Sequence, residues 1–201
     1  MDRQIVCFAI PSLEIALVRL SHPQLRTRPL AVAALDTPRA LIREISPEAE
    51  RDGLHIGMPL DRARRLCPSL QVRLPNPHQV ATATHSIFGV IQRYAPTWEP
   101  LLPGSLLMDL TGTTRLLGTA CDVATKIQTE VLTQFHLEGA AGVGSNKLVA
   151  QTAATLIAPS ELYDVRSGSE RLFMSPLPIR ALPCVHCPCM PAVLKRLDDL
   201  N

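Results

Sequence analysis

The sequence has 201 residues, of which 46% are hydrophobic and 19% charged, so a wholly disordered chain is excluded and one or two compact domains are expected. Lysine and arginine total 20 against 18 aspartate and glutamate residues, so nucleic-acid contact would need a local basic patch rather than bulk charge. Aromatic residues make up only 3%, which argues against a surface that stacks successive bases on aromatic rings.

The N-terminal residues lack the length and flanks of a secretory signal, and no stretch approaches the roughly 18 apolar residues of a membrane span. We therefore expect a cytoplasmic protein without membrane contact. In a reducing compartment the six cysteines are expected to remain thiols. The segment from Cys184 to Cys189, with His186 and Cys187, offers four soft ligands. No second ligand pair completes a closed zinc site, so we interpret the segment as a turn and leave open whether it binds metal.

Hydrophobic periodicity and turn residues predict the elements in chain order. The first half is predicted to contain a strand over 5–10, a helix over 13–20, strands over 30–35 and 40–45, helices over 47–53 and 59–67, and a strand over 71–74. After a proline-rich boundary at 74–77, the second half is predicted to contain a helix over 80–93, a strand over 105–111, a helix over 123–135, a strand over 139–143, and helices over 146–157 and 193–200. This order predicts an α+β or α/β sheet domain that is interrupted by a smaller one.

The glycines before the helix at 146–157 partly match a phosphate-binding loop. Gly139 and Gly144 have P-loop spacing, but Ser145 stands where that motif requires lysine. We interpret the segment as a tight strand-to-helix turn, with Lys147 in the first helical turn available to a phosphate. No nucleophile elbow or catalytic cysteine context is present.

Five blocks, in order, carry a more specific pattern. They are residues 22–32 (HPQLRTRPLAV), 46–59 (SPEAERDGLHIGMP), 99–112 (EPLLPGSLLMDLTG), 142–150 (GVGSNKLVA) and 177–183 (LPIRALP). Together they resemble the Y-family (DinB/UmuC-type) translesion DNA polymerases over nearly the whole chain. The resemblance implies an α+β fold: a palm with a ferredoxin-like antiparallel sheet and helices on one face (1–18 and 76–165), a small α/β fingers insert (19–75) and a partial helical thumb (166–201).

The family holds two Mg²⁺ ions with carboxylates from the first palm strand and the palm hairpin, which neutralise charge during phosphoryl transfer. The resemblance places these positions at Ala9 and Pro11 in the strand and at Gly104 and Ser105 in the hairpin. None of these residues supplies the carboxylate oxygens that hold Mg²⁺. We therefore expect no catalytic residues, no metal and no cofactor.

The nucleotide-binding positions of the family are also changed. The tyrosine and arginine that grip the triphosphate correspond to Pro47 and Glu50, and the aromatic residue that screens the sugar corresponds to Glu14. A glutamate at such a position repels phosphate. Asp109 is retained, in a position to which the resemblance assigns a structural role.

This combination resembles the catalytically inactive ImuB-like branch of the family. The resemblance implies an accessory protein of DNA-damage tolerance, induced in the SOS response, that supports translesion synthesis and mutagenesis. Its implied partners are damaged primer-template DNA, bound weakly by this fragment, an error-prone C-family polymerase and a RecA-like accessory protein. A sliding clamp is expected to bind through regions that follow the thumb. The expected DNA contacts are Lys147, Lys195 and Arg196.

Two alternatives stay open. One is an active translesion polymerase whose metal carboxylates have moved to positions such as Glu14 and Asp109. The other is a protein-interaction module without DNA affinity, which the near-zero net charge favours.

Overall fold

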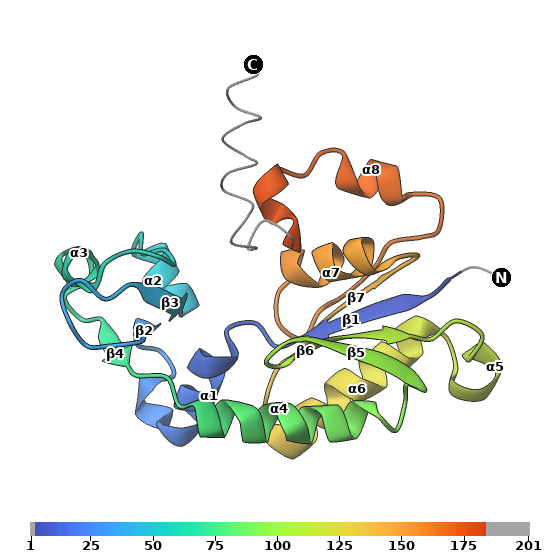
Figure 1. Cartoon of the computed structure of the whole chain (residues 1–201), viewed down its shortest axis with the longest axis horizontal. Helices are drawn as coiled ribbons and strands as arrows, with labels where there is room; N and C mark the ends of the chain where they lie inside the picture. Colours follow the sequence, from blue (N-terminus) through green and yellow to red (C-terminus); the bar gives the residue numbers. More distant parts are fainter. Residues whose placement is uncertain (1–2, 184–201) are drawn as a thin grey trace. The chain divides into compact units, whose positions relative to one another are not determined.

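The computed structural model describes residues 3–183, which form two compact units (Figure 1). Among the described residues, the first unit consists of 3–11 and 89–183, and the second of Ser12–Phe88. The first carries a five-stranded sheet of order β5-β6-β1-β7-β8, and the second a three-stranded sheet of order β3-β2-β4. The predicted mixture of sheets and helices is confirmed, whereas the three-part division into palm, fingers and thumb stays a prediction.

The first unit is built around β1 (Ile5–Ala9), a run of buried apolar residues at the centre of the sheet. Its other strands are β5 (Thr97–Leu102), β6 (Ser105–Asp109), β7 (Ala140–Gly144) and β8 (Leu162–Asp164). Its helices are α5 (Thr114–Leu117), α6 (Ala120–Phe135), α7 (Lys147–Leu156) and α8 (Glu170–Met174), followed by a 3₁₀ turn at Ile179–Ala181. A further helix, α4 (Pro77–Ile91), runs from the second unit into the first.

The sheet differs from the predicted palm in two details. Strands β5, β6, β1 and β7 pair antiparallel as predicted, whereas the edge strand β8 is parallel to β7, because these two strands are joined through α7 and such a crossover connects parallel strands. Helices also lie on both faces, with α7 on one side of the sheet and α6 on the other (Figure 1). Gly142 allows α7 to pack closely against β7, because a Cβ atom at this position would lie only 2.2 Å from the carbonyl oxygen of Ala150.

The second unit packs helices on both sides of its small sheet. The strands are β2 (Leu30–Ala33), β3 (Ile42–Ile45) and β4 (Gln71–Arg73), with β2 antiparallel to β3 and parallel to β4. The helices are α1 (Leu13–Ser21), α2 (Pro47–Arg51) and α3 (Leu60–Leu66), with a 3₁₀ turn at Pro23–Leu25. One apolar cluster joins Ala31, Ala33 and Ile42 to the α2 and α3 side, and another joins Val32 to Ile15 of α1.

N-cap residues determine where two of the helices begin. The buried Ser46 hydroxyl accepts a hydrogen bond from the Ala49 backbone at 3.4 Å and begins α2, as its sequence predicts. The helix predicted over 80–93 begins earlier, at Pro77, because the Asn76 side chain accepts from the Gln79 backbone at 3.1 Å. The short elements α5, β8 and α8 were not predicted. The helix predicted over 193–200 lies outside the described residues.

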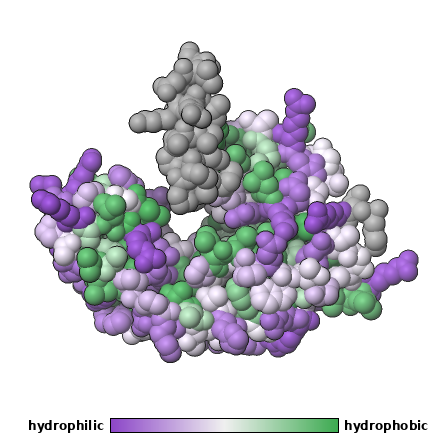
Figure 2. Space-filling model, in the orientation of Figure 1, coloured by the Kyte–Doolittle hydropathy of each residue, from purple (hydrophilic) through white to green (hydrophobic). Residues whose placement is uncertain are grey.

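Hydrophobic residues gather on the surface over α7 and α8 (Figure 2). A groove of about 350 Å³ lies there, and its lining includes Leu156, Ile157, Tyr163, Leu172, Phe173 and Leu177. Leu172 is 78% exposed. Among residues 3–183, none of the helices combines the length and the apolar character that a membrane crossing needs.

Candidate functional site

Three of the four predicted metal positions come together at one end of the first unit's sheet. Ala9, the last residue of β1, lies opposite Ser105, the first residue of β6. The turn between β5 and β6 is Pro103-Gly104, with φ of 71° at Gly104, and the Gly104 carbonyl accepts a hydrogen bond from the backbone of Ile10 at 3.0 Å. Pro11 follows β1 as an exposed turn residue.

The side chains at this end of the sheet do not fit a divalent cation. Ala9 presents a methyl group, Gly104 no side chain and Ser105 a neutral hydroxyl, whereas Mg²⁺ prefers carboxylate oxygens. Burial raises the pKa of the neighbouring Cys7 thiol to about 12, a hydrogen bond with Ser105 only partly offsetting it, so this sulfur is protonated at neutral pH. Over residues 3–183, no three His, Cys, Asp or Glu side chains form a group that could hold a metal ion.

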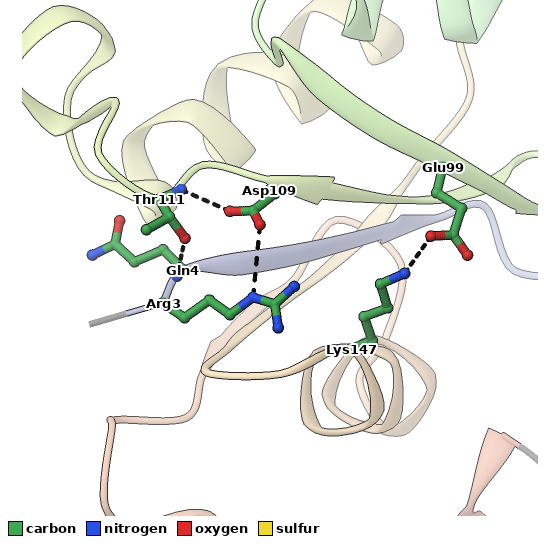
Figure 3. Close-up of polar contacts among 6 residues, drawn as sticks. All are labelled: Arg3, Gln4, Glu99, Asp109, Thr111 and Lys147. Atoms are coloured by element: carbon green, nitrogen blue, oxygen red, sulfur yellow. Dashed lines mark hydrogen bonds and ion pairs between the residues drawn. The ribbon is translucent and has the colours of Figure 1, made fainter. Parts of the chain in front are cut away.

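Lys147 is placed by the turn that follows β7. Asn146 caps α7 by accepting a hydrogen bond from the Val149 backbone at 3.0 Å, which puts Lys147 at the first helical position. The Lys147 ammonium forms an ion pair with Glu99 of β5 (Figure 3). Both side chains are about half exposed, so the lysine is accessible but its charge is partly compensated.

Asp109 lies at the other end of β6 from Ser105, four residues and about 14 Å away along the strand. Its carboxylate accepts a hydrogen bond from the Thr111 backbone at 3.0 Å and lies 3.6 Å from the Arg3 guanidinium (Figure 3). Partial burial raises the pKa of Asp109, but the hydrogen bonds from Thr111 and the charge of Arg3 outweigh it and hold the pKa below its usual value. These contacts fit the structural role predicted for this acid.

The two ion pairs frame a small pocket on the side of the sheet that α7 covers. Its volume is about 130 Å³, and its lining includes Arg3, Ile5, Glu99, Leu107, Asp109 and Lys147. The lining contains two cations and two carboxylates beside apolar side chains, so the pocket has little net charge. Sequence reasoning missed this pairing, because Lys147 and Glu99 lie 48 residues apart.

The predicted nucleotide-contact positions lie in the second unit. Glu14 is in the first turn of α1, and its carboxylate lies 3.5 Å from the Arg43 guanidinium. Pro47 and Glu50 are exposed on α2. Two neighbouring carboxylates were not singled out from the sequence. Glu48 forms an ion pair with Arg19 at 2.5 Å, and Glu44 accepts a hydrogen bond from the Ile15 backbone at 3.2 Å.

The predicted DNA contacts Lys195 and Arg196, and the segment from Cys184 to Cys189, lie outside the described residues. Their roles stay predictions. The cysteines of the described part, Cys7, Cys67 and Cys121, are free thiols, as expected.

Comparison with known proteins identifies the family. A family model described as the impB/mucB/samB family matches residues 11–155, and the chain belongs to this family. DNA polymerase IV of Desulfatibacillum aliphaticivorans is 31% identical over 166 residues, which are 81% of this chain and 41% of that protein. DNA polymerase IV of Akkermansia muciniphila is 30% identical over 183 residues, which are 90% of this chain and 50% of that protein. The chain thus spans half the length or less of these curated relatives.

Solved structures show the same fold. DinB from Sulfolobus solfataricus superposes with a TM-score of 0.84 at 20% identity, covering 98% of this chain and 57% of that one. An insertion ternary complex of Dbh DNA polymerase gives a TM-score of 0.84 at 20% identity, with coverage of 98% and 58%. The predicted resemblance to the Y-family and the predicted fold class are therefore confirmed.

Proposed function

We propose that this protein is a non-catalytic Y-family homologue that acts as an accessory protein in DNA-damage tolerance, as in the ImuB-like branch. The proposal rests on one observation: Ala9, Gly104 and Ser105 lie close together at the β5–β6 hairpin. A strand end and a facing hairpin are brought together there, yet no side chain offers the anionic oxygens that two-metal phosphoryl transfer needs. Pro47 and Glu50 support the same conclusion for the triphosphate.

Its proposed ligand is damaged primer-template DNA. The structural neighbours include ternary and binary complexes of Dbh DNA polymerase, which supports a nucleic-acid role for the shared fold. Lys147, Lys195 and Arg196 are the proposed phosphate contacts, and the Glu99 carboxylate beside Lys147 is expected to keep binding weak. An error-prone C-family polymerase, a RecA-like accessory protein and the sliding clamp are the proposed protein partners in the cytoplasm.

A primer-extension assay tests the proposal. The protein is incubated with primer-template and all four deoxynucleotides in Mg²⁺ and separately in Mn²⁺, beside a DNA polymerase IV relative as the positive control. We expect no extension in either metal. Template-dependent extension that Asp109→Ala abolishes would contradict the proposal, because a contaminating polymerase would not respond to that substitution.

An active polymerase with relocated carboxylates remains the second candidate, because the curated relatives are named DNA polymerase IV. The contacts of Asp109 speak against it. This carboxylate already accepts from Thr111 and pairs with Arg3, at the far end of β6 from Ser105.

A protein-interaction module without DNA affinity is the third candidate, favoured by the pairing of Lys147 with Glu99. A salt titration of DNA binding separates it from the proposal. Binding through phosphates weakens steeply as salt rises, whereas an interaction module shows no DNA binding at any salt concentration.

A further inference from the structure

The N-terminus of α1 lacks a local cap. The first backbone N–H groups of a helix have no partner within it, and a side chain just before the helix usually accepts from them. Here Ser12 precedes α1 with left-handed angles, φ 48° and ψ 55°, and makes no capping hydrogen bond with its side chain. Its hydroxyl instead points to the carbonyl oxygen of Ile45 at 3.5 Å. The helix is nine residues long, so the N–H groups of its first turn carry a partial positive charge and need acceptors from outside the helix.

Glu44, from β3, supplies the missing acceptor. Its Oε2 lies 3.2 Å from the Ile15 nitrogen, in the third position of α1. The side chain is half-buried, so the contact is partly shielded from water. Burial and the neighbouring Glu14 raise the pKa of Glu44, while hydrogen bonds from the backbone of Ile15 and Glu14 lower it in part. The charged form of Glu44 is therefore destabilised, and its hydrogen bonds with the N-terminus of α1 offset this only in part.

An irregularity in β3 aims Glu44 at α1. Side chains alternate along a regular strand, so Ile42 and Glu44 would face the same side. The register shifts between these residues, with Glu44 opposite Val32 and Ile42 opposite Ala33, so Arg43 is an extra residue. Ile42 thereby packs into the cluster with Ala33, whereas Glu44 lies opposite Val32, which packs against Ile15 of α1. The bulge thus directs a carboxylate to the helix end.

A second carboxylate adds negative charge at the same place. Glu14 lies in the first turn of α1, with only 14% of its side chain exposed. One of its oxygens is 3.5 Å from the Arg43 guanidinium, and the other is buried without a hydrogen-bond partner. Glu14 thus holds the ion pair with Arg43, whose side chain is 55% exposed, while the charge of the same arginine lowers the pKa of Glu44 only as a minor effect.

We propose that Glu44 is an internal anion that occupies the N-terminal end of α1 and, with Glu14, closes it to nucleoside triphosphates. Helix N-termini bind phosphate through their free N–H groups and positive dipole end. Here a carboxylate of the chain itself has taken the donor, and Glu14 repels a further anion. The inference rests on the proposed function in that it assigns a physical cause to the loss of nucleotide binding, and it makes Glu44 a specificity-determining residue.

Titration of the full chain with inorganic tripolyphosphate, without metal, tests the inference. The amide signal of Ile15 in ¹⁵N NMR reports binding at the helix end. Wild type is expected to show no change of this signal. Glu44→Gln, which removes the charge but keeps an oxygen acceptor, is expected to shift the Ile15 signal and to bind at least about fivefold more tightly than the detection limit that wild type sets, from the removal of one like charge. Glu44→Ala, which empties the position, is expected to bind more tightly still.

Glu138→Gln is the matched control, since it makes the same chemical change at an exposed residue of the first unit, and it should leave the Ile15 signal unresponsive. If Glu44→Ala does not fold, Glu44→Gln alone decides. An Ile15 signal that shifts equally in wild type and variants, or in none of them, overturns the inference.

Primer extension by wild type would overturn the proposed function instead. An inactive wild type whose Glu44 variants gain no affinity overturns the inference alone. The two failures are therefore distinguishable.

Discussion

Replacing Gly142 with alanine tests the packing that places Lys147. Gly142 lies in the middle of β7, where α7 covers the strand. A Cβ atom built there would lie 2.2 Å from the Ala150 carbonyl oxygen, 2.4 Å from the Ala154 nitrogen and 2.9 Å from the Ala153 methyl group. Two of these atoms belong to the helix backbone and cannot rotate away. Gly142→Ala therefore requires α7 to move as a body.

The size of the effect follows from these distances. Ordinary van der Waals contact begins near 3.4 Å, so α7 must retreat by about 1 Å to admit the methyl group. Overpacking of a filled core costs about 1 to 3 kcal/mol, and backbone obstacles place this substitution near the upper limit. For a chain of this length, about 3 kcal/mol corresponds to a fall in Tm of about 6 to 12 °C.

Thermal and urea unfolding, followed by circular dichroism, measure the change. Gly89→Ala is the matched control, because Gly89 is exposed in α4 and a Cβ atom there meets nothing within 4 Å. Alanine at that helical position is expected to raise stability by about 0.5 to 1 kcal/mol. A Gly142→Ala protein with the stability of wild type would refute the claim that this glycine allows α7 to sit on β7.

Three further predictions follow from the site. The double variant Ala9→Asp, Ser105→Asp places two carboxylates opposite each other, so it should bind Mn²⁺, which electron paramagnetic resonance detects. Primer extension should stay absent. Extension by this variant would contradict the proposed loss of the triphosphate site. Glu99→Gln removes the ion-pair partner of Lys147, so DNA affinity should rise and the slope of log K against log salt concentration should steepen by about 0.7 to 0.9. Glu138→Gln, at an exposed residue, is the control and should leave the slope unchanged. Equal slopes for the two variants would contradict the role of Lys147 as a phosphate contact. Because the folded pKa of Cys7 is about 12, the unfolded chain loses this proton first, so stability should fall as pH rises above about 9. Cys7→Ser should remove that part of the pH dependence in urea titrations.

The sequence was sufficient to predict those elements that a short apolar run or a single capping residue defines. The apolar run at β1 predicts a buried strand, Ser46 before Pro47 predicts the start of α2, and Asn146 marks the start of α7. The fold class followed from motif order rather than from periodicity. The sequence did not reveal β8, because three partly exposed residues give no pattern and the strand exists through its pairing with β7.

The candidate site was predictable in part, for a related reason. The family resemblance assigned Ala9, Gly104 and Ser105 to one metal site, and these residues lie together in the structure. The role of Glu44 was hidden, because the bulge at Arg43 reverses the alternation from which a side chain's direction is inferred. Pairings such as Lys147 with Glu99 depend on strands meeting across long stretches of chain, which residue spacing alone does not encode.

The Pro103-Gly104 turn limits which side chains this hairpin can carry. A residue at position 104 needs the positive φ that glycine adopts there, at a cost of about 1 to 2 kcal/mol for most residues and less for aspartate. Proline fixes the φ angle at position 103, so the loop has little freedom to relax around a new side chain. The backbone therefore penalises an acidic side chain at position 104, glutamate more than aspartate.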